Sequence, residues 1–548
     1  MKRTQRSTDT PERRAKNIRS LRKLFPEVFI EDKVDFAKLK AVLGEYAEIE
    51  DERYAFTWSG KAAAMRLAQE LPAGRLKGCV QESKDWETTE NLYIEGDNLA
   101  VLQLLKESYT SKVRVIYIDP PYNTGKDFVY ADNFRESLGS YMRSTDEAAD
   151  PSGAAETSGH LHTEWLNMIY PRLLLARELL RNDGLIFISI DDTEVDNLRK
   201  ICSEIFGEEN YITTFVWEKT QHFGRQKLNI YNTRDFIVCF AKQLKDQRGA
   251  IKELLVEQIF TDLEDAPLYN ASNPEKILVF PPQSVRFNIS DGRYTETADP
   301  KYTLIDPVIV KDGVNEDAFS LRFRSRWNAE RVIAEYQEGT RYWVKTNKFA
   351  IRTIYPESRT SKRAMRNMIF TNRRNDNVAI NHFGITPGTN ESATEELRQL
   401  FGIKLFDYPK PTSLLGYLIG CVFDEKTQAP DTDCIVLDFF SGSGTTAEAV
   451  MRLNALDGGK RKFIMVQLPE DLDLALKQAP AGERETLENA IEFLDSLDKP
   501  HLLSEIGKER IRRAGEKIRA ENPESEEGAA LDIGFKVFQL DTSDILTR

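Results

Sequence analysis

The sequence predicts a doubly wound, Rossmann-like α/β sheet interrupted by a mixed α+β insert, with helical regions at the N- and C-termini. Two observations predict this fold class. Apolar strands alternate with helices in two separate stretches of chain, and polar turns rich in glycine or proline follow the strands. Between these stretches lies a long basic segment in which the alternation is lost. One sheet is therefore expected to be assembled from two distant parts of the sequence.

Length and composition fit a large globular protein. At about 150 residues per domain, 548 residues suggest three or four domains. Hydrophobic residues make up 41% and charged residues 30%, which allows a large core without disulfide or metal staples. The net charge of -13 argues against a uniformly basic nucleic-acid coat. It leaves room for a basic patch on an acidic body.

Several classes of protein are disfavoured. The longest apolar runs, such as 185–190 and 435–440, are far shorter than the roughly 20 residues of a membrane span. The charged N-terminus has no apolar stretch behind it, so no signal peptide is expected. The five cysteines include no CxxC pair. We therefore expect a cytoplasmic protein with reduced cysteines, no metal site and no membrane contact.

The first half of the predicted sheet spans residues 91–216, after a basic arm and helical region at 1–90. A short strand at 92–95 precedes a helix at 99–108. The run 113–118, rich in β-branched residues, is typical of a buried parallel strand and ends at Asp119-Pro120-Pro121-Tyr122. A loop is expected at 137–160, then a helix at 165–180 and a strand at 185–190. The pair Asp191-Asp192 is expected to end that strand and cap the next helix.

The insert at 217–395 is the candidate DNA-binding domain. Residues 341–376 hold ten cations against two anions, with aromatic residues between them. Such a mixture suits phosphate contact and base stacking, although a basic patch is more often a solvated face. The candidate DNA-binding residues are Arg322, Arg324, Arg352, Arg359, Lys362, Arg363, Arg366, Arg373 and Arg374.

The second half of the sheet spans residues 396–475. A strand at 434–440, a tight loop at 441–446, a helix from 447 and a strand at 462–467 restore the α/β pattern. Residues 476–548 are helical and charged. They fit a dimer or partner contact, and a solvated helical appendage fits them equally well.

The loop after the 434–440 strand is glycine-rich. Gly442 and Gly444 allow a tight turn and a close approach of the backbone to a nucleotide-like ligand. The spacing also satisfies the relaxed dinucleotide fingerprint, so a nicotinamide-dependent oxidoreductase is an alternative. That enzyme would want an acid where Gln467 stands, and the nearest acid is Glu470. Asp438 instead suits a cofactor with a cationic amino group, such as S-adenosylmethionine.

The turn Asp119-Pro120-Pro121-Tyr122 follows a strand at its carboxyl end, where open α/β sheets bind ligands. An exocyclic base amine is a poor nucleophile, because its lone pair is delocalised into the ring. A carboxylate and a rigidly held carbonyl, Asp119 and that of Pro120, could accept its two hydrogens. Tyr122 offers a flat face to a base flipped out of the duplex, where stacking returns about 1–3 kcal/mol.

Two other mechanisms lack their motifs. No cysteine follows a proline, which disfavours C5-cytosine methylation. The sequence has no GxxxxGK[ST] loop, which disfavours a nucleotide-driven motor in this chain. His160 and His162 look like a metal pair, but no third ligand is obvious, and a structural or solvated role is expected.

Taken together, these motifs resemble the amino-methyltransferases of DNA in which the catalytic motif precedes the cofactor loop. More narrowly, the chain resembles the modification (Mod) subunit of type III restriction–modification systems. The resemblance runs from about residue 50 to the C-terminus. It is carried by Ile94–Asn98, Ile116–Lys126 with Phe128, Trp165–Leu173, Tyr408–Ser413, Asp438–Thr446 and Ser504–Arg510.

The resemblance implies a role for each matching residue. Asp119, Pro120, Pro121 and Tyr122 would be catalytic. S-adenosylmethionine would be held by Asp438, Phe440, Gly442 and Gly444, with Asp97 near its adenine ring. Lys410, Pro411 and Thr412 would complete the pocket. Gln467 or Glu470 would contact the ribose. The missing strand-end acid leaves the last choice open.

The resemblance also implies substrate and partners. The insert would be a target-recognition domain for double-stranded DNA, the chain would form a homodimer, and a separate helicase–nuclease subunit would join it. Aspartate at position 119 favours adenine-N6 over cytosine-N4 as the target. A DNA-binding module without catalysis is a further alternative. Methylation of a protein glutamine is disfavoured, because enzymes with that substrate usually have asparagine in place of Asp119.

Overall fold

The computed structural model describes most of the chain. Before residue 56 it describes only isolated positions and the short strands β1 (Phe29–Ile30) and β2 (Lys33–Val34). Beyond these, the described residues are 56–72, 74–123, 154–221, 232–245, 249, 251–260, 266–356, 360–371, 379–381, 383–424, 426–480, 482–522 and 531–542. Side chains are not described at 154–160, 258–266 and 360–363.

The chain forms two compact units, each described by itself. The first contains residues 1–251, 394–409 and 433–548, and the second contains 252–393 and 410–432. The predicted end of the insert at 395 lies close to the unit boundary between residues 393 and 394. The boundary predicted at 217 falls inside a strand of the first unit, and both chain ends contribute strands to that unit's sheet.

The first unit is built on one large sheet. Its parallel strands are β4 (Leu92–Glu95), β5 (Val113–Ile118), β6 (Leu180–Ile190), β24 (Ile435–Asp438), β25 (Lys462–Gln467) and β26 (Lys536–Asp541). Antiparallel strands at its two sides are β3 (Arg75–Gly78), β7 (Tyr211–Glu218) and β8 (Arg234–Ala241). Their spatial order is β7-β8-β6-β5-β24-β25-β4-β26-β3.

This order confirms the doubly wound α/β fold and locates its switch point. From β5 the chain moves to β6 on one side, whereas from β24 it moves to β25 on the other side. The neighbours β5 and β24 are therefore the strands at which the winding direction reverses. In open α/β sheets, ligands bind outside the carboxyl ends of the strands at such a point.

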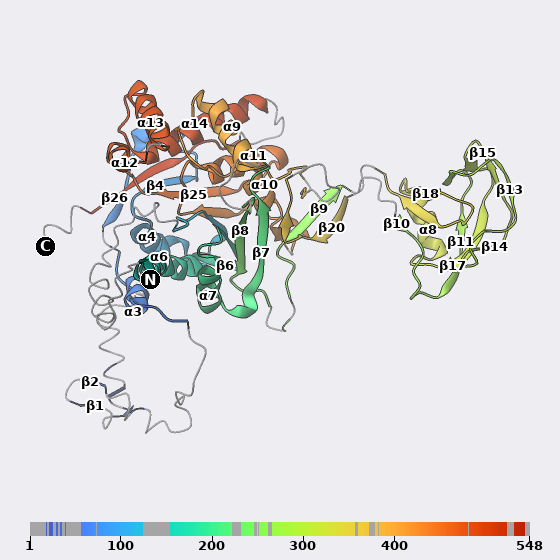
Figure 1. Cartoon of the computed structure of the whole chain (residues 1–548), viewed down its shortest axis with the longest axis horizontal. Helices are drawn as coiled ribbons and strands as arrows, with labels where there is room; N and C mark the ends of the chain where they lie inside the picture. Colours follow the sequence, from blue (N-terminus) through green and yellow to red (C-terminus); the bar gives the residue numbers. More distant parts are fainter. Residues whose placement is uncertain are drawn as a thin grey trace, which may run out of the picture. The chain divides into compact units, whose positions relative to one another are not determined.

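Helices pack on the sheet of the first unit, as Figure 1 shows. Helices α3 (Lys61–Leu67), α4 (Asn98–Tyr109) and α7 (Val195–Phe206) all contact the long helix α6 (Ala154–Leu179). Helix α11 (Thr445–Asp457) contacts α14 (Leu503–Glu521). All six residues of β5 are buried, as expected for a central parallel strand.

Three local predictions differ from the structure. Residues 154–160, predicted as loop, begin α6, which continues through Pro171. Strands β7 and β8 pair antiparallel and extend the large sheet, whereas the sequence predicts that the insert begins at 217. Helix α7 is preceded by Glu194 as its N-cap residue, while Asp191 accepts the backbone N–H of Thr193.

The second unit contains a β-rich lobe with its own core. A seven-stranded sheet has the order β10-β19-β18-β12-β16-β15-β13, and a three-stranded sheet has the order β11-β17-β14. Their strands are β10 (Ala266–Pro267), β11 (Glu275–Phe280), β12 (Val285–Phe287), β13 (Gly292–Tyr294), β14 (Thr303–Leu304), β15 (Val308–Lys311), β16 (Val314–Asn315), β17 (Phe319–Arg324), β18 (Arg341–Val344) and β19 (Ile351–Ile354). Helix α8 (Ala329–Gln337) packs against β11.

The remaining elements are short. In the second unit these are β9 (Val256–Phe260), β20 (Thr360–Ala364), β21 (Met368–Ile369), α10 (Thr412–Gly420), β22 (Phe423–Asp424) and β23 (Ala429–Pro430). Single 3-10 turns occupy Val80–Glu82 and Glu208–Asn210, and α9 (Asn390–Phe401), α12 (Leu472–Gln478) and α13 (Arg484–Ser496) complete the description. No helix in the described part of the chain is long and apolar enough to cross a membrane.

Candidate functional site

The two motifs singled out in the sequence meet at the switch point. Asp119 follows β5 directly, and Asp438 is the last residue of β24. Because Leu437 pairs with Ile116 in parallel register, both carboxylates lie at the same edge of the sheet. The charge of Asp119 is close enough to contribute to the raised pKa of Asp438.

Asp438 anchors the glycine loop from within. The Thr446 hydroxyl donates to Oδ2 of Asp438 at 2.6 Å, and the backbone N–H of Phe440 donates to Oδ1 at 3.0 Å. Gly442 and Gly444 have φ angles of 50° and 83°, in the left-handed region that favours glycine. At Gly444 a Cβ would also lie 3.2 Å from the carbonyl oxygen of Gly507.

The buried Asp438 carboxyl is the candidate group to pair with a cation. Burial raises its pKa to about 7, although the hydrogen bonds from Thr446 and Phe440 favour the charged form. Its exposed fraction is 3%. Within the described residues, no lysine or arginine pairs with this carboxylate. A ligand ammonium group would fit this environment, since it would supply the missing opposite charge.

The structure separates the roles of Gln467 and Glu470. Gln467 is built into the loop, because its Oε1 accepts the backbone N–H of Gly442 at 2.7 Å and its Nε2 donates to the carbonyl of Leu468 at 3.2 Å. Burial raises the pKa of the Glu470 carboxyl. Among the described residues, none forms a hydrogen bond with the side chain of Glu470. Glu470 is therefore the better candidate to bind ribose hydroxyls.

Asp97 lies at the start of α4 and is fixed from two sides. Its Oδ1 caps the helix by accepting the N–H of Ala100 at 3.1 Å, and its Oδ2 pairs with Arg172 at 3.0 Å. Arg172 is fully buried on α6 and also donates to the side chain of Asn98. Asn98 in turn donates to the carbonyl of Phe439 at 2.7 Å. Arg172 thereby links Asp97 to the end of β24.

The catalytic-motif turn is stabilised by its own tyrosine and by α6. The Tyr122 hydroxyl donates to Oδ1 of Asp119 at 3.0 Å. Burial, reinforced by Asp119, holds the pKa of Tyr122 well above its usual range, so the hydroxyl stays neutral. Trp165 Nε1 donates to the carbonyl of Pro121 at 2.7 Å. The role of Pro120 in accepting a substrate amine stays a prediction.

Sequence reasoning gave no role to Arg510, which supports the glycine loop from α14. This buried side chain donates to the hydroxyls of Ser443 and Thr445 at 2.7 and 2.6 Å and pairs with Glu448 at 3.0 Å. The motif Ser504–Arg510 was noted only as part of the family resemblance. Ile506 and Arg510 are four residues apart, so in a helix they lie on one face. That spacing is the sequence signal that could have identified Arg510.

The predicted DNA-binding residues lie on several elements of the second unit. Arg322 and Arg324 are exposed on β17, and Arg352 lies on β19 of the other sheet. Arg366 follows β20. Arg359, Arg373 and Arg374, and the side chains of Lys362 and Arg363, lie outside the described residues. A DNA interface formed by this set stays a prediction.

Lys410, Pro411 and Thr412 also belong to the second unit, at the start of α10. Their part in a cofactor pocket stays a prediction. Of the two candidate histidines, His162 contacts the carboxylate of Glu194, and the side chain of His160 is not described. Among described residues, no three His, Cys, Asp or Glu side chains are grouped as a metal site would require.

Comparisons with known proteins point to one family. The DNA methylase family matches residues 113–471. The chain is 32% identical to the StyLTI Mod subunit of a type III restriction–modification enzyme from Salmonella typhimurium, over 83% of this chain and 61% of that protein. It is 30% identical to the EcoPI Mod subunit of Escherichia phage P1, over 86% of this chain and 73% of that protein. It is also 30% identical to the EcoP15I Mod subunit of Escherichia coli, over 96% and 77% respectively.

Proposed function

Because the chain belongs to the DNA methylases, and among them to the Mod subunits of type III restriction–modification enzymes, we propose that it transfers a methyl group from S-adenosylmethionine to N6 of adenine in a specific DNA sequence. Family membership supports the predicted enzyme class and the predicted cofactor, S-adenosylmethionine. The chain spans 61% of the length of the StyLTI relative, and its activity, substrate and partners are proposals.

One observation carries the proposal. The Asp119 motif and the glycine loop of Asp438 follow adjacent parallel strands at the switch point. A base amine at the first motif and a cofactor at the second would therefore be brought to the same sheet edge. Methyl transfer from a sulfonium needs such proximity, because catalysis consists largely of aligning the two reactants.

The residues at this edge fit the cofactor. Asp438 would receive the ammonium group, and the backbone of Gly442 and Gly444 would allow the ligand to approach closely. Glu470 would accept the ribose hydroxyls, and Asp97 would lie near the adenine ring. The bound cofactor supplies an electrophilic methyl group. Phe440 and the Lys410–Thr412 segment are proposed to complete the pocket.

The protein's own residues would prepare the target base. Asp119 would accept a hydrogen bond from one N–H of the exocyclic amine, and the carbonyl of Pro120 would accept one from the other N–H. The neutral Tyr122 hydroxyl holds one oxygen of Asp119, and its ring would stack on the flipped base. No covalent intermediate is needed in this scheme.

The target base and partners are further parts of the proposal. Aspartate rather than serine at position 119 favours adenine-N6. The matched family includes both N6- and N4-methyltransferases, so cytosine-N4 is the alternative. The three relatives named above are subunits of type III restriction–modification enzymes. We propose that this chain acts in the cytoplasm as a dimer and that a restriction subunit joins it.

A methyl-transfer assay tests the proposal. The full chain is incubated with duplex DNA and S-adenosylmethionine carrying a labelled methyl group. We expect label in DNA with the parent chain. Asp119→Ala should abolish transfer and retain DNA binding. A parent chain that binds DNA but transfers no methyl group would support the non-catalytic DNA-binding module instead.

A further inference from the structure

A buried carboxylate lies at the end of the catalytic turn. Glu194 has no exposed surface and precedes α7 directly. Its Oε1 accepts the side-chain N–H of Asn123 at 2.6 Å and a hydrogen bond from Nδ1 of His162. Its Oε2 accepts the side-chain N–H of Asn197 at 2.8 Å. Within the described structure, no lysine or arginine pairs with this carboxylate, so neutral donors and His162 must satisfy it.

Asn123 connects this carboxylate to the catalytic motif. It follows Tyr122 directly and has a φ angle of 59°, in the left-handed region that asparagine adopts more readily than most residues other than glycine. Its exposed fraction is only 4%. A backbone conformation of this kind persists when the surroundings fix it, and such residues cluster at functional sites. The hydrogen bond to Glu194 holds the side chain of Asn123 in this conformation.

The turn is therefore held at two points beyond its own strand. Trp165 of α6 binds the carbonyl of Pro121, and Glu194 binds the side chain of Asn123. Asp119 and Tyr122 lie next to these anchor points. These two contacts therefore hold the turn that carries Asp119 and Tyr122, and small misplacements of catalytic groups are costly.

We propose that Glu194 is a positioning residue for methyl transfer, which acts on Asp119 and Tyr122 by fixing Asn123 through a charge-assisted hydrogen bond. The inference rests on the function proposed above. It predicts that the direction of the hydrogen bond matters, and not merely the volume of the two side chains. Asn123 must donate, because an ionised carboxylate only accepts.

Reversing the bond tests this directly. Asn123→Asp keeps the shape of the side chain but removes the donor and places two carboxylates together. We expect the single-turnover methyl-transfer rate of the full chain to fall about tenfold or more. The dissociation constants for DNA and S-adenosylmethionine should change by no more than about twofold, within the scatter of independent sites. Adding Glu194→Gln should restore at least about threefold, because the glutamine amide can now donate to the new carboxylate.

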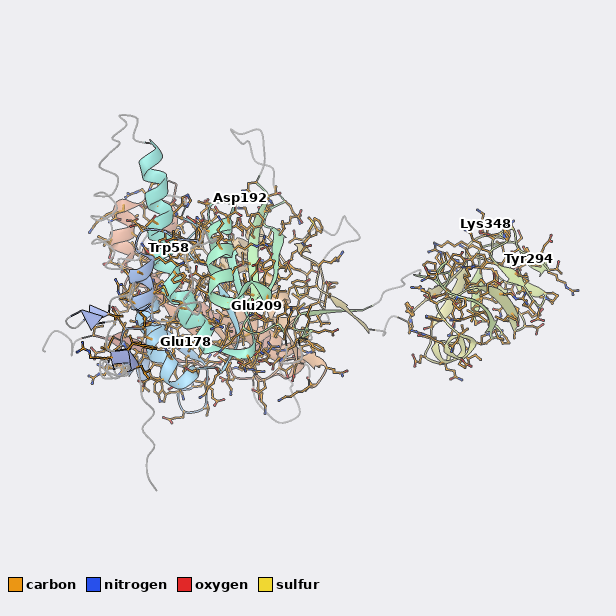
Figure 2. All side chains as sticks on the ribbon, turned by 90° about the horizontal axis from the view of Figure 1, so that it is seen from below. Trp58, Glu178, Asp192, Glu209, Tyr294 and Lys348 are labelled. Atoms are coloured by element: carbon orange, nitrogen blue, oxygen red, sulfur yellow. The ribbon has the colours of Figure 1, made fainter. Side chains whose placement is uncertain are left out.

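A matched control uses the same substitution elsewhere. Asn232 donates to Oδ2 of Asp192 at 3.1 Å, but this pair is exposed. Figure 2 labels Asp192, whose pair with Asn232 lies at the surface of the first unit. Asn232→Asp should leave the transfer rate within about twofold, since exposed pairs contribute little. If Asn123→Asp fails to fold by thermal melting, Asn123→Gly tolerates the φ angle and still removes the donor.

The outcomes separate the inference from the proposed function. Slower transfer in Asn123→Asp and Asn123→Gly, with unchanged binding and rescue by Glu194→Gln, supports it. A parental rate in either variant, or equal loss in the double and single variants, would overturn the positioning role while the proposed function stands. No transfer by the parent chain would overturn both.

Discussion

The side-chain oxygen Oε1 of Gln467 accepts a hydrogen bond from the backbone N–H of Gly442 at 2.7 Å. Gln467 ends β25, where the sequence lacks the acid expected to bind a cofactor ribose. The structure gives this residue another task, since it holds the glycine loop in place. Glu470, three residues further along, is therefore our candidate for the cofactor contact.

This division of roles predicts different effects at the two positions. Glu470→Gln should weaken S-adenosylmethionine binding about tenfold, because a charged hydrogen-bond acceptor is lost. Gln467→Glu keeps the acceptor for Gly442 and should weaken binding by no more than about threefold. Isothermal titration calorimetry of the full chain measures both. A larger loss in Gln467→Glu than in Glu470→Gln would reverse the assignment.

The affinity for S-adenosylmethionine should depend on pH through Asp438. Burial raises the pKa of this carboxyl to about 7, so below that pH the group is largely protonated and neutral. A neutral carboxyl cannot pair with an ammonium group. The dissociation constant should therefore rise as pH falls below about 7, by up to about tenfold per pH unit, and be nearly constant above it.

Asp438→Asn provides the control for this pH profile. Asparagine keeps the shape but carries no charge at any pH. We expect weaker binding of S-adenosylmethionine throughout and a flat profile between about pH 6 and pH 8. A parental profile that is flat over the same range would contradict the role given to Asp438.

Arg510 is expected to support cofactor binding from a distance. In Arg510, Nη1 donates to both Ser443 and Thr445 while Nε donates to Glu448, and the single ammonium group of Arg510→Lys cannot make both sets of contacts at once. We expect S-adenosylmethionine affinity to fall by about five- to tenfold, with DNA affinity unchanged. Arg513→Lys on the same helix is the matched control, because Arg513 pairs with Glu509 and does not contact the loop. Equal effects of the two substitutions would refute this role.

The exposed arginines of β17 test the recognition domain. Replacing both Arg322 and Arg324 with alanine should weaken DNA binding across all sequences. The slope of log binding constant against log salt concentration should fall in magnitude by about 0.9 per lost phosphate contact. Arg66→Ala with Lys460→Ala removes the same charge from exposed positions of the first unit. DNA binding measured by fluorescence anisotropy at several salt concentrations distinguishes the two double variants. An unchanged salt slope in the first pair would mean that these arginines do not touch DNA.

Much of the catalytic sheet could be predicted from the sequence, because local patterns encode it. The β-branched run 113–118 and the apolar run 435–438 are buried strands, and each leads directly into its motif. That the two strands are neighbours follows from the topology of a doubly wound sheet. The hairpin of β7 and β8 was missed because antiparallel strands break the strand–helix alternation used to set the boundary.

The supporting residues could not be predicted in the same way. Glu194, Arg172 and Arg510 act through contacts between residues distant in sequence. A buried glutamate before a helix has the same sequence pattern as a solvated helix cap, and only packing distinguishes them. The choice of Glu470 over Gln467 as the candidate ribose contact likewise depends on the hydrogen bond between Gln467 and the backbone of Gly442.

The identity of the methylated base tests the central claim most directly. DNA modified by the full chain is digested to nucleosides, which are separated and identified by mass. We predict that DNA treated with the parent chain contains N6-methyladenine and that DNA treated with Asp119→Ala does not. N4-methylcytosine without N6-methyladenine would contradict the claim.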